Sequence, residues 1–204
     1  MFTGIIECIG VVTSAEQQGS NVHFTLESPI SRELRIDQSL AHDGVCLTVV
    51  SADATTYRVT AIDETLRRTA LVHWRPGGQE NLERSMQIGG RLDGHMVQGH
   101  VDLTGVCVAR TEAGGSWLFD FEHPLSEELY TVPKGSITVN GVSLTVVDST
   151  RTTFRVAIIP YTWEHTTFHL LHPGDPVNLE FDMIGKYLTR YLRYLAPAAG
   201  NPKP

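Results

Sequence analysis

The 204-residue sequence predicts an all-β protein made of two similar small antiparallel barrels or sandwiches, followed by one C-terminal helix. Three observations support this fold class. The chain carries the same module twice, each copy consists mainly of short strand-like segments bounded by turn residues, and one amphipathic segment follows the second copy. Because the repeat has the size of a domain, the sequence indicates a tandem pair of domains rather than a solenoid.

The internal repeat keeps one register over most of the module. A shift of 97 positions places Asn81-Leu82-Glu83 on Asn178-Leu179-Glu180. Further upstream the shift is 95 positions, as for Gly4 and Gly99, which indicates an insertion of two residues near Val132-Pro133. Two copies that share so many positions are expected to fold alike.

Within each copy the local pattern is that of β-strands. Segments rich in β-branched and aromatic residues partly alternate between apolar and polar positions, at 45–50, 57–61, 142–146 and 154–158. Asp43-Gly44 and Asn140-Gly141 precede two of these segments. Such pairs supply the positive backbone dihedral angles of tight hairpin turns, so the strands are expected to be antiparallel.

A glycine-rich stretch at 87–94 lies between the copies and is the expected linker. We therefore place the first domain at residues 1–90 and the second at residues 91–182, with a helix at 183–195 and a tail at 196–204. The tail is rich in Pro, Ala and Gly and is expected to be disordered.

The segment 183–195 has the pattern of an amphipathic helix. Its apolar residues recur at helical spacing and form one stripe, which we call the apolar stripe: Ile184, Tyr187, Leu188, Tyr191, Leu192 and Leu195. Lys186, Arg190 and Arg193 lie off this stripe. The stripe fits either of two surfaces, the protein's own barrel or the same helix of neighbouring subunits, and periodicity alone leaves both open.

Composition excludes several classes of partner. The net charge of -7 and the pI near 5.7 argue against nucleic acids and anionic membranes, which select basic surfaces. No apolar run is long enough to span a membrane, and no secretory signal is present, so the protein is expected to be cytoplasmic. Cys8, Cys46 and Cys107 form an odd set that suits reduced thiols.

Motifs for common cofactors are missing from the sequence. There is no Gly-x-Gly-x-x-Gly, no P-loop and no Cys-x-x-Cys. His95 and His100 could be imagined as metal ligands, but no cluster of further ligands completes a set. We therefore predict neither a cofactor nor a metal.

Positions at which the two copies differ are the more informative ones. Cys46 aligns with Ser143, and Ser85 aligns with Asp182. A duplicated binding module whose nucleophilic and acidic positions have diverged is what an enzyme with two substrate sites would need.

Several segments together resemble the riboflavin synthase family of the α-chain type, which has two lumazine-binding domains. They span nearly the whole chain: Met1-Phe2-Thr3-Gly4-Ile5-Ile6-Glu7, His42-Asp43-Gly44-Val45-Cys46-Leu47-Thr48-Val49, Gly94-His95-Met96-Val97-Gln98-Gly99-His100-Val101, Lys134-Gly135-Ser136 and Asn140-Gly141-Val142-Ser143-Leu144-Thr145-Val146. The resemblance implies two six-stranded Greek-key β-barrels followed by a C-terminal α-helix that serves oligomerisation. It also implies a homotrimer with active sites between the first barrel of one subunit and the second barrel of another.

The activity implied by the resemblance is a transferase reaction, the dismutation of two molecules of 6,7-dimethyl-8-ribityllumazine. Its products are riboflavin and 5-amino-6-(ribitylamino)uracil, and it is the last step of riboflavin biosynthesis. Besides this small-molecule substrate, lumazine synthase, which makes it, is a possible partner. A cofactor is not needed, because the 7-methyl protons are acidic through conjugation with the ring and the protein has to stack two rings and move protons.

The resemblance assigns catalytic roles to Cys46, His100, Ser143 and Asp182. It assigns substrate contacts to Phe2, Gly4, Ile5, Ile6, Cys46, Leu47, Thr48, Thr60, Ala61, Ile62, Asp63, Glu64, Thr65, Gly99, His100, Val101, Lys134, Ser143, Leu144, Thr145, Ile159, Pro160, Tyr161, Thr162, Trp163 and Glu164.

Simpler roles exist for the main candidates. Cys46 could be a small buried apolar residue, His100 a hydrogen-bonded core histidine, and Asp182 the N-terminal cap of the helix. Lys134 could be a solvated loop charge. Trp163 stands where the family pattern leads us to expect an aliphatic residue, which we interpret as a variation in packing.

Two other functions compete with the enzyme. One is a non-catalytic lumazine- or flavin-binding protein, which would keep the barrels but lose reactive residues. The presence of Phe2, Cys46, His100, Ser143 and Asp182 favours the enzyme. The other is a structural pair of barrels, which would not explain why polar pocket motifs recur in both copies.

Overall fold

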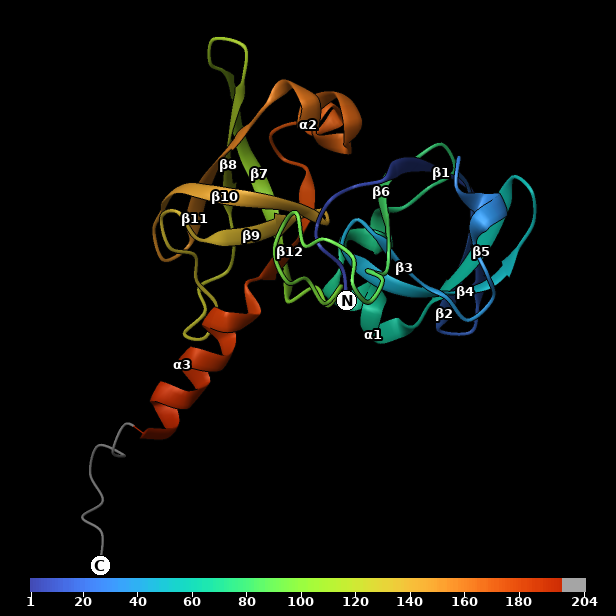
Figure 1. Cartoon of the computed structure of the whole chain (residues 1–204), viewed down its shortest axis with the longest axis horizontal. Coiled ribbons are helices and arrows are strands. Elements are labelled where there is room, and N and C mark those ends of the chain that lie inside the picture. Colours follow the sequence, from blue (N-terminus) through green and yellow to red (C-terminus); the bar gives the residue numbers. More distant parts are fainter. Residues whose placement is uncertain (196–204) are drawn as a thin grey trace, which may run out of the picture.

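The computed structural model describes residues 1–195 and consists of two closed six-stranded antiparallel β-barrels followed by a helix (Figure 1). The predicted all-β fold with two similar barrels and a C-terminal helix is confirmed. The expected disorder at 196–204 lies outside the described residues.

The two barrels are built from the same elements in the same cyclic order. The first contains β1 (Cys8–Gln18), β2 (Asn21–Glu27), β3 (Ser39–His42), β4 (Val45–Ala52), β5 (Thr56–Ala61) and β6 (Gln79–Arg84), with helices η1 (Ser31–Glu33), α1 (Asp63–Arg68) and η2 (Ala70–His73). The second contains β7 (Leu103–Glu112), β8 (Trp117–Glu122), β9 (Ser136–Val139), β10 (Val142–Ser149), β11 (Thr153–Ile158) and β12 (Pro176–Phe181), with α2 (Pro160–His165) and η3 (Thr167–Leu170). In each barrel the first strand pairs with the second and the sixth, and the third pairs with the fourth and the sixth.

Alternation along the strands explains why each barrel closes around its own core. In β5, Tyr57, Val59 and Ala61 are buried while the residues between them are not. The β3–β4 turn has positive φ at Asp43 (45°) and Gly44 (81°), the geometry that the sequence predicted for a tight hairpin. The strand pattern and the turn chemistry therefore agree with the observed register.

The two-residue insertion lengthens one loop of the second barrel. The loop between β2 and β3 covers residues 28–38, and its counterpart between β8 and β9 covers residues 123–135. The longer loop contacts the C-terminal helix α3 (Met183–Leu195), since the Tyr130 hydroxyl lies 3.0 Å from Thr189 Oγ1 and Arg193 donates to Glu128 at 2.8 Å. The loop that carries the insertion thus packs against the helix.

Helix α3 extends away from the second barrel and contacts its own chain through its polar side (Figure 1). Thr189 is buried, whereas every residue of the apolar stripe remains more than half exposed. From periodicity alone, one would expect the apolar stripe to be the buried side of the helix. Instead, the polar side on the opposite face contacts the chain. Among residues 1–195, no helix combines the length and apolarity needed to span a membrane.

The barrels meet through contacts that obey the internal repeat. Asn81 donates to the Asn140 carbonyl at 2.9 Å and accepts from the Thr167 N–H at 2.8 Å. Its counterpart Asn178 donates to the Asp43 carbonyl at 3.0 Å and accepts from an N–H in η2 at 2.7 Å. Matched residues thus make matched contacts across the junction, which gives the chain an internal twofold pseudosymmetry.

Candidate active site

Two segments of the chain each leave their own module and lie against the barrel of the other module. We call residues 1–6 and 96–101 the crossing segments. The Ser143 N–H donates to the Gly4 carbonyl at 2.7 Å, and the Cys46 N–H donates to the Gly99 carbonyl at 2.9 Å. Each segment therefore lies against the β4 or β10 strand of the other module, and the repeat relates these two contacts to each other.

The crossing joins part of the predicted site residues into two groups. Residues 99–101 of the second module meet the first barrel at Cys46, and Val101 packs against the first core; the predicted residues 47–48 and 60–65 belong to this barrel. Residues 4–6 of the first module meet the second barrel at Ser143, and Ile6 packs against the second core; the predicted residues 144–145 and 159–164 belong to that barrel. Each candidate site thus needs both modules.

Close approach of the crossing segments requires glycine. Gly4 and Gly99 have φ of 76° and 78°, a region that favours glycine. A Cβ atom on Gly4 would lie 2.6 Å from the Ser143 Cβ, and one on Gly99 would lie 2.8 Å from the Cys46 Cβ and 2.8 Å from the Phe2 ring. The backbone of each segment consequently touches the residue that was predicted to be catalytic.

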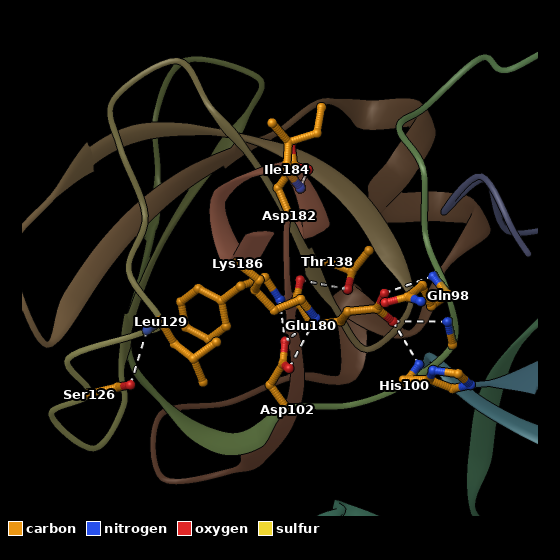
Figure 2. A network of polar contacts seen from close by, with 12 residues as sticks. Gln98, His100, Asp102, Ser126, Leu129, Thr138, Glu180, Asp182, Ile184 and Lys186 are labelled. Atoms are coloured by element: carbon orange, nitrogen blue, oxygen red, sulfur yellow. Dashed lines mark hydrogen bonds and ion pairs between the residues drawn. The ribbon is translucent and has the colours of Figure 1, made fainter. Parts of the chain in front are cut away.

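Two buried glutamates hold the crossing segments in place. Glu83 accepts hydrogen bonds from the Thr3 N–H (2.6 Å), the Thr3 hydroxyl (2.7 Å) and the Gly4 N–H (2.9 Å). Glu180 accepts from the N–H groups of residues 98, 99 and 100 at 2.7, 2.9 and 2.9 Å (Figure 2). Burial raises the pKa of both carboxyls, and these hydrogen bonds oppose that rise.

Neither glutamate is among the site residues that the sequence predicts. A signal was present in the identical Asn-Leu-Glu at 81–83 and 178–180, because a charged residue that follows an apolar one at the same position of two matched strands has to find a partner if it is buried. The partners themselves, N–H groups some eighty positions away, could not be read from the sequence.

In the first-barrel site, Cys46 is half-buried and lies over a small apolar cluster of Phe2, Ala41 and Val97. Phe2 is completely buried, and Cys46 packs against the cluster to which it belongs. His100 is held by its backbone to Glu180, and its side chain is exposed. This placement does not fit the alternative in which His100 is a core histidine.

In the second-barrel site, Ser143 Oγ lies 2.7 Å from His95 Nδ1. Burial lowers the pKa of His95, and the negative charge of Asp182 raises it. A neutral imidazole in contact with a hydroxyl can act as a general base, so the pair provides a route for a proton. Asp182 also accepts from the Ile184 N–H at 3.0 Å, as a helix cap would.

His95 had been considered only as a metal ligand. Its place within the Gly94–Val101 motif was the available signal, but the contact with Ser143 depends on the crossing of the linker onto the second barrel. Within residues 1–195, no three His, Cys, Asp or Glu side chains gather as a metal site would require.

Trp163 has a packing role. Its ring stacks on Trp117 at 4.1 Å and 6°, and both rings pack against the second core. The matched positions of the first barrel are Leu66 and Val22, which pack against the first core. Two aromatic rings thus stand where the first barrel has two aliphatic side chains, which supports the interpretation of Trp163 as a variation in packing.

The remaining predicted contacts vary in exposure. Lys134 is exposed, and its N–H donates to the Val146 carbonyl beside the second-barrel site. Exposed side chains belong to Ile5, Thr48, Ile62, Glu64, His100, Lys134, Thr145, Ile159, Pro160, Tyr161 and Glu164; half-buried ones to Ile6, Cys46, Thr60, Asp63, Thr65, Val101, Ser143, Thr162, Trp163 and Asp182; buried residues are Phe2, Gly4, Leu47, Ala61, Gly99 and Leu144.

Comparison with known proteins agrees with this architecture. The model of the lumazine binding domain family matches twice, at residues 3–85 and 98–182. The fold and the two matched sites thus define a protein with tandem lumazine-binding domains. Curated relatives include the riboflavin synthases of Mycobacterium tuberculosis (42% identical, covering 95% of this chain and 98% of that protein), Bacillus subtilis (39%, 94% and 90%) and Actinobacillus pleuropneumoniae (38%, 100% and 94%). The chain belongs to the riboflavin synthase family, which confirms the resemblance.

Solved structures share the fold at lower identity. LumP in complex with 6,7-dimethyl-8-(1'-D-ribityl)lumazine superimposes with a TM-score of 0.80 at 20% identity, covering 88% of this chain and 98% of that chain. LumP in complex with riboflavin superimposes with a TM-score of 0.81, also at 20% identity, covering 89% and 99%.

Proposed function

We propose that the protein is a riboflavin synthase, a transferase that moves a four-carbon unit between two molecules of 6,7-dimethyl-8-ribityllumazine. The observation that carries the proposal is the pair of related but unequal sites, each completed by a segment of the other module. A reaction between two copies of one molecule needs one donor site and one acceptor site. Cys46 in one site and Ser143 in the other give the two sites different chemistry.

The overall reaction needs no oxidant or reductant. Riboflavin and 5-amino-6-(ribitylamino)uracil together contain all the atoms of two lumazine molecules, so the enzyme's tasks are to align the rings and to transfer protons. The Ser143–His95 pair supports proton transfer at the second-barrel site. We assign substrate contacts to the residues around both crossing segments, and catalytic roles to Cys46, His100, Ser143 and Asp182.

The alternative function is that of a non-catalytic lumazine- or flavin-binding protein. Such a protein would bind the ligand and leave it unchanged. The hydrogen-bonded Ser143–His95 pair favours the enzyme, because a binding site needs no proton acceptor next to a hydroxyl. The two functions differ in whether riboflavin is formed.

The first prediction is the stoichiometry of turnover. Purified protein mixed with 6,7-dimethyl-8-ribityllumazine and a metal chelator should consume two lumazines for each riboflavin formed, with no added nicotinamide. Absorbance and chromatography of the products measure the ratio. Tight binding without turnover would favour the binding protein, and a requirement for a metal or nicotinamide would contradict the proposed mechanism.

We further propose that the protein is a cytoplasmic homotrimer in which the first barrel of one subunit faces the second barrel of another. We also propose that it associates with lumazine synthase. The exposed apolar stripe supports the assembly. Its side chains are 54–69% exposed in the single chain, and an apolar stripe of this kind is typical of an interface between helices. The described residues thus leave more than half of each of these residues open to solvent.

The second prediction concerns the apolar stripe. Leu188→Ala combined with Leu192→Ala should weaken assembly and lower turnover about tenfold or more at low protein concentration, because each subunit then lacks the facing barrel. Activity should return as the concentration rises. Arg190→Ala, on the same helix but off the stripe, should change neither property. Sedimentation and activity are measured on the same samples, and a fully active monomer would contradict the intersubunit site.

A further inference from the structure

One half-buried ion pair connects helix α3 to the first-barrel site. Lys186 Nζ lies 3.0 and 2.9 Å from the two carboxylate oxygens of Asp102, and the two side chains are only 22% and 17% exposed (Figure 2). Asp102 directly follows the crossing segment that carries His100 and Val101. The helix that bears the apolar stripe therefore touches the chain just beyond these predicted substrate contacts.

Asp102 fixes the end of this crossing segment to the second barrel. Its carboxylate accepts from the Phe181 N–H at 2.9 Å, and its own N–H donates to the Leu179 carbonyl at 2.9 Å. Glu180, between these two residues on β12, holds the N–H groups of residues 98–100. Asp102 and Glu180 thus form one anchor for the segment that reaches Cys46.

The anchor contains two carboxylates and one cation. The charge of Asp102 raises the pKa of Glu180, and the charge of Lys186 lowers it. Removing Lys186 would leave the charge of Asp102 without its partner next to the buried Glu180, and an unpaired buried charge is costly. Lys186 therefore offsets the repulsion between the two carboxylates that accept the N–H hydrogen bonds.

The first module supplies the corresponding cation in a different way. Glu7, which aligns with Asp102, accepts from the Arg84 N–H at 2.7 Å and pairs with the Arg84 guanidinium at 2.6 Å. In the second module the position of Arg84 is occupied by Phe181, which brings no charge. The first crossing segment is thus held by a cation of its own barrel, whereas the second depends on a cation from α3.

We propose that Lys186 is a positioning residue of the first-barrel site, which it controls through Asp102 and the crossing segment 96–101. The first-barrel site is thereby connected to the helix that bears the apolar stripe through an ion pair, whereas the second-barrel site is connected to it through Asp182, the residue that caps the helix. This inference rests on the proposed function of both sites as lumazine sites.

The test is an equilibrium titration of the full-length protein with riboflavin, the proposed product, which the protein alone does not consume. In Lys186→Met, half of the sites should bind about tenfold more weakly and the other half should be unchanged. Arg84→Met, the mirror-image variant, should weaken the opposite half, so the double variant should weaken both. Arg190→Met removes an exposed charge from the same helix and should leave both classes of site unchanged. Sedimentation should show the same assembly state for Lys186→Met as for the wild type.

A rescue variant separates positioning from a general loss of structure. Asp102→Asn keeps an oxygen that can accept from the Phe181 N–H but removes the charge that Lys186 balances. Adding it to Lys186→Met should restore binding to within about twofold of the wild type. Unchanged binding in Lys186→Met, or an equal loss at both classes of site without rescue, would overturn the inference. A wild-type protein that binds no riboflavin would instead refute the proposed function.

Discussion

Replacing Gly99 with alanine is expected to lower turnover of 6,7-dimethyl-8-ribityllumazine about a hundredfold or more. The added methyl group would lie 2.8 Å from both the Cys46 Cβ and the Phe2 ring, and Phe2 is completely buried. The crossing segment must then move away from Cys46. A displacement on the order of 1 Å at a reacting centre can cost about a hundredfold in rate.

The control for this prediction is Gly89→Ala in the linker. Gly89 has φ of 84°, close to that of Gly99, but a Cβ atom there would meet nothing within 4 Å. Both variants carry the cost of alanine at positive φ, roughly 1 kcal/mol, and only Gly99→Ala carries the clash. Gly89→Ala should keep wild-type turnover. Turnover above about a tenth of the wild-type rate in Gly99→Ala would show that the contact with Cys46 is not needed for the reaction.

The fold was predictable because the sequence patterns that determine it are local and occur in both modules. Each module carries its own alternating strands and its own Asp-Gly or Asn-Gly hairpin, so the same architecture follows independently from either copy. The two-residue insertion was also placed close to where it lies, in the loop between β8 and β9.

The crossing of the segments was not predictable from the repeat. The matched positions of Gly4 and Gly99 show that they are equivalent, but not whether each glycine lies on its own barrel or on the other. The contacts that decide this, to Ser143 and Cys46, join residues far apart in the sequence. For the same reason His95 was missed as a partner of Ser143.

The orientation of α3 could not be predicted from the sequence for a different reason. Periodicity identifies the apolar stripe but not the surface that covers it. On the polar side, Lys186, Thr189 and Arg193 find partners in Asp102 and in the β8–β9 loop, so this side faces the chain. Only the long-range pairing explains why the stripe points outward.

The first barrel contains a buried carboxyl pair that the second barrel lacks. Asp43 and Glu80 are 8% and 5% exposed and lie close enough for each to shift the pKa of the other, whereas the matched residues are Asn140 and Val177. Burial raises the pKa of Glu80 far above its usual range, and the charge of Asp43 raises it further. Two buried carboxyls this close repel each other when both are ionised, so we expect the folded protein to keep a proton that the unfolded chain releases above about pH 4.5.

The stability of the protein should therefore fall as the pH rises above neutrality. A carboxyl with a raised pKa contributes stability that is complete below its unfolded pKa and is lost as the pH rises toward its folded pKa. Between about pH 7 and about pH 8.5, the free energy of unfolding should drop by up to about 1.4 kcal/mol per pH unit. His42 does not disturb this window, because burial lowers its pKa to about 4 and its contribution is constant above pH 6.5.

Glu80→Gln should remove this dependence, since the amide can donate to Asp43 without a titrating proton. Urea unfolding at several pH values within the window measures the slope for the wild type, for Glu80→Gln and for Glu112→Gln, a neutralised carboxyl on the exposed surface. The free energy of unfolding should fall with pH at the same slope in the wild type and in Glu112→Gln. In Glu80→Gln this slope should be smaller by up to the amount that one titrating proton contributes. Because all other groups are common to the three proteins, the difference in slope isolates Glu80. Equal slopes in all three would show that Glu80 is already ionised at neutral pH and that Asp43 and Glu80 do not share a proton.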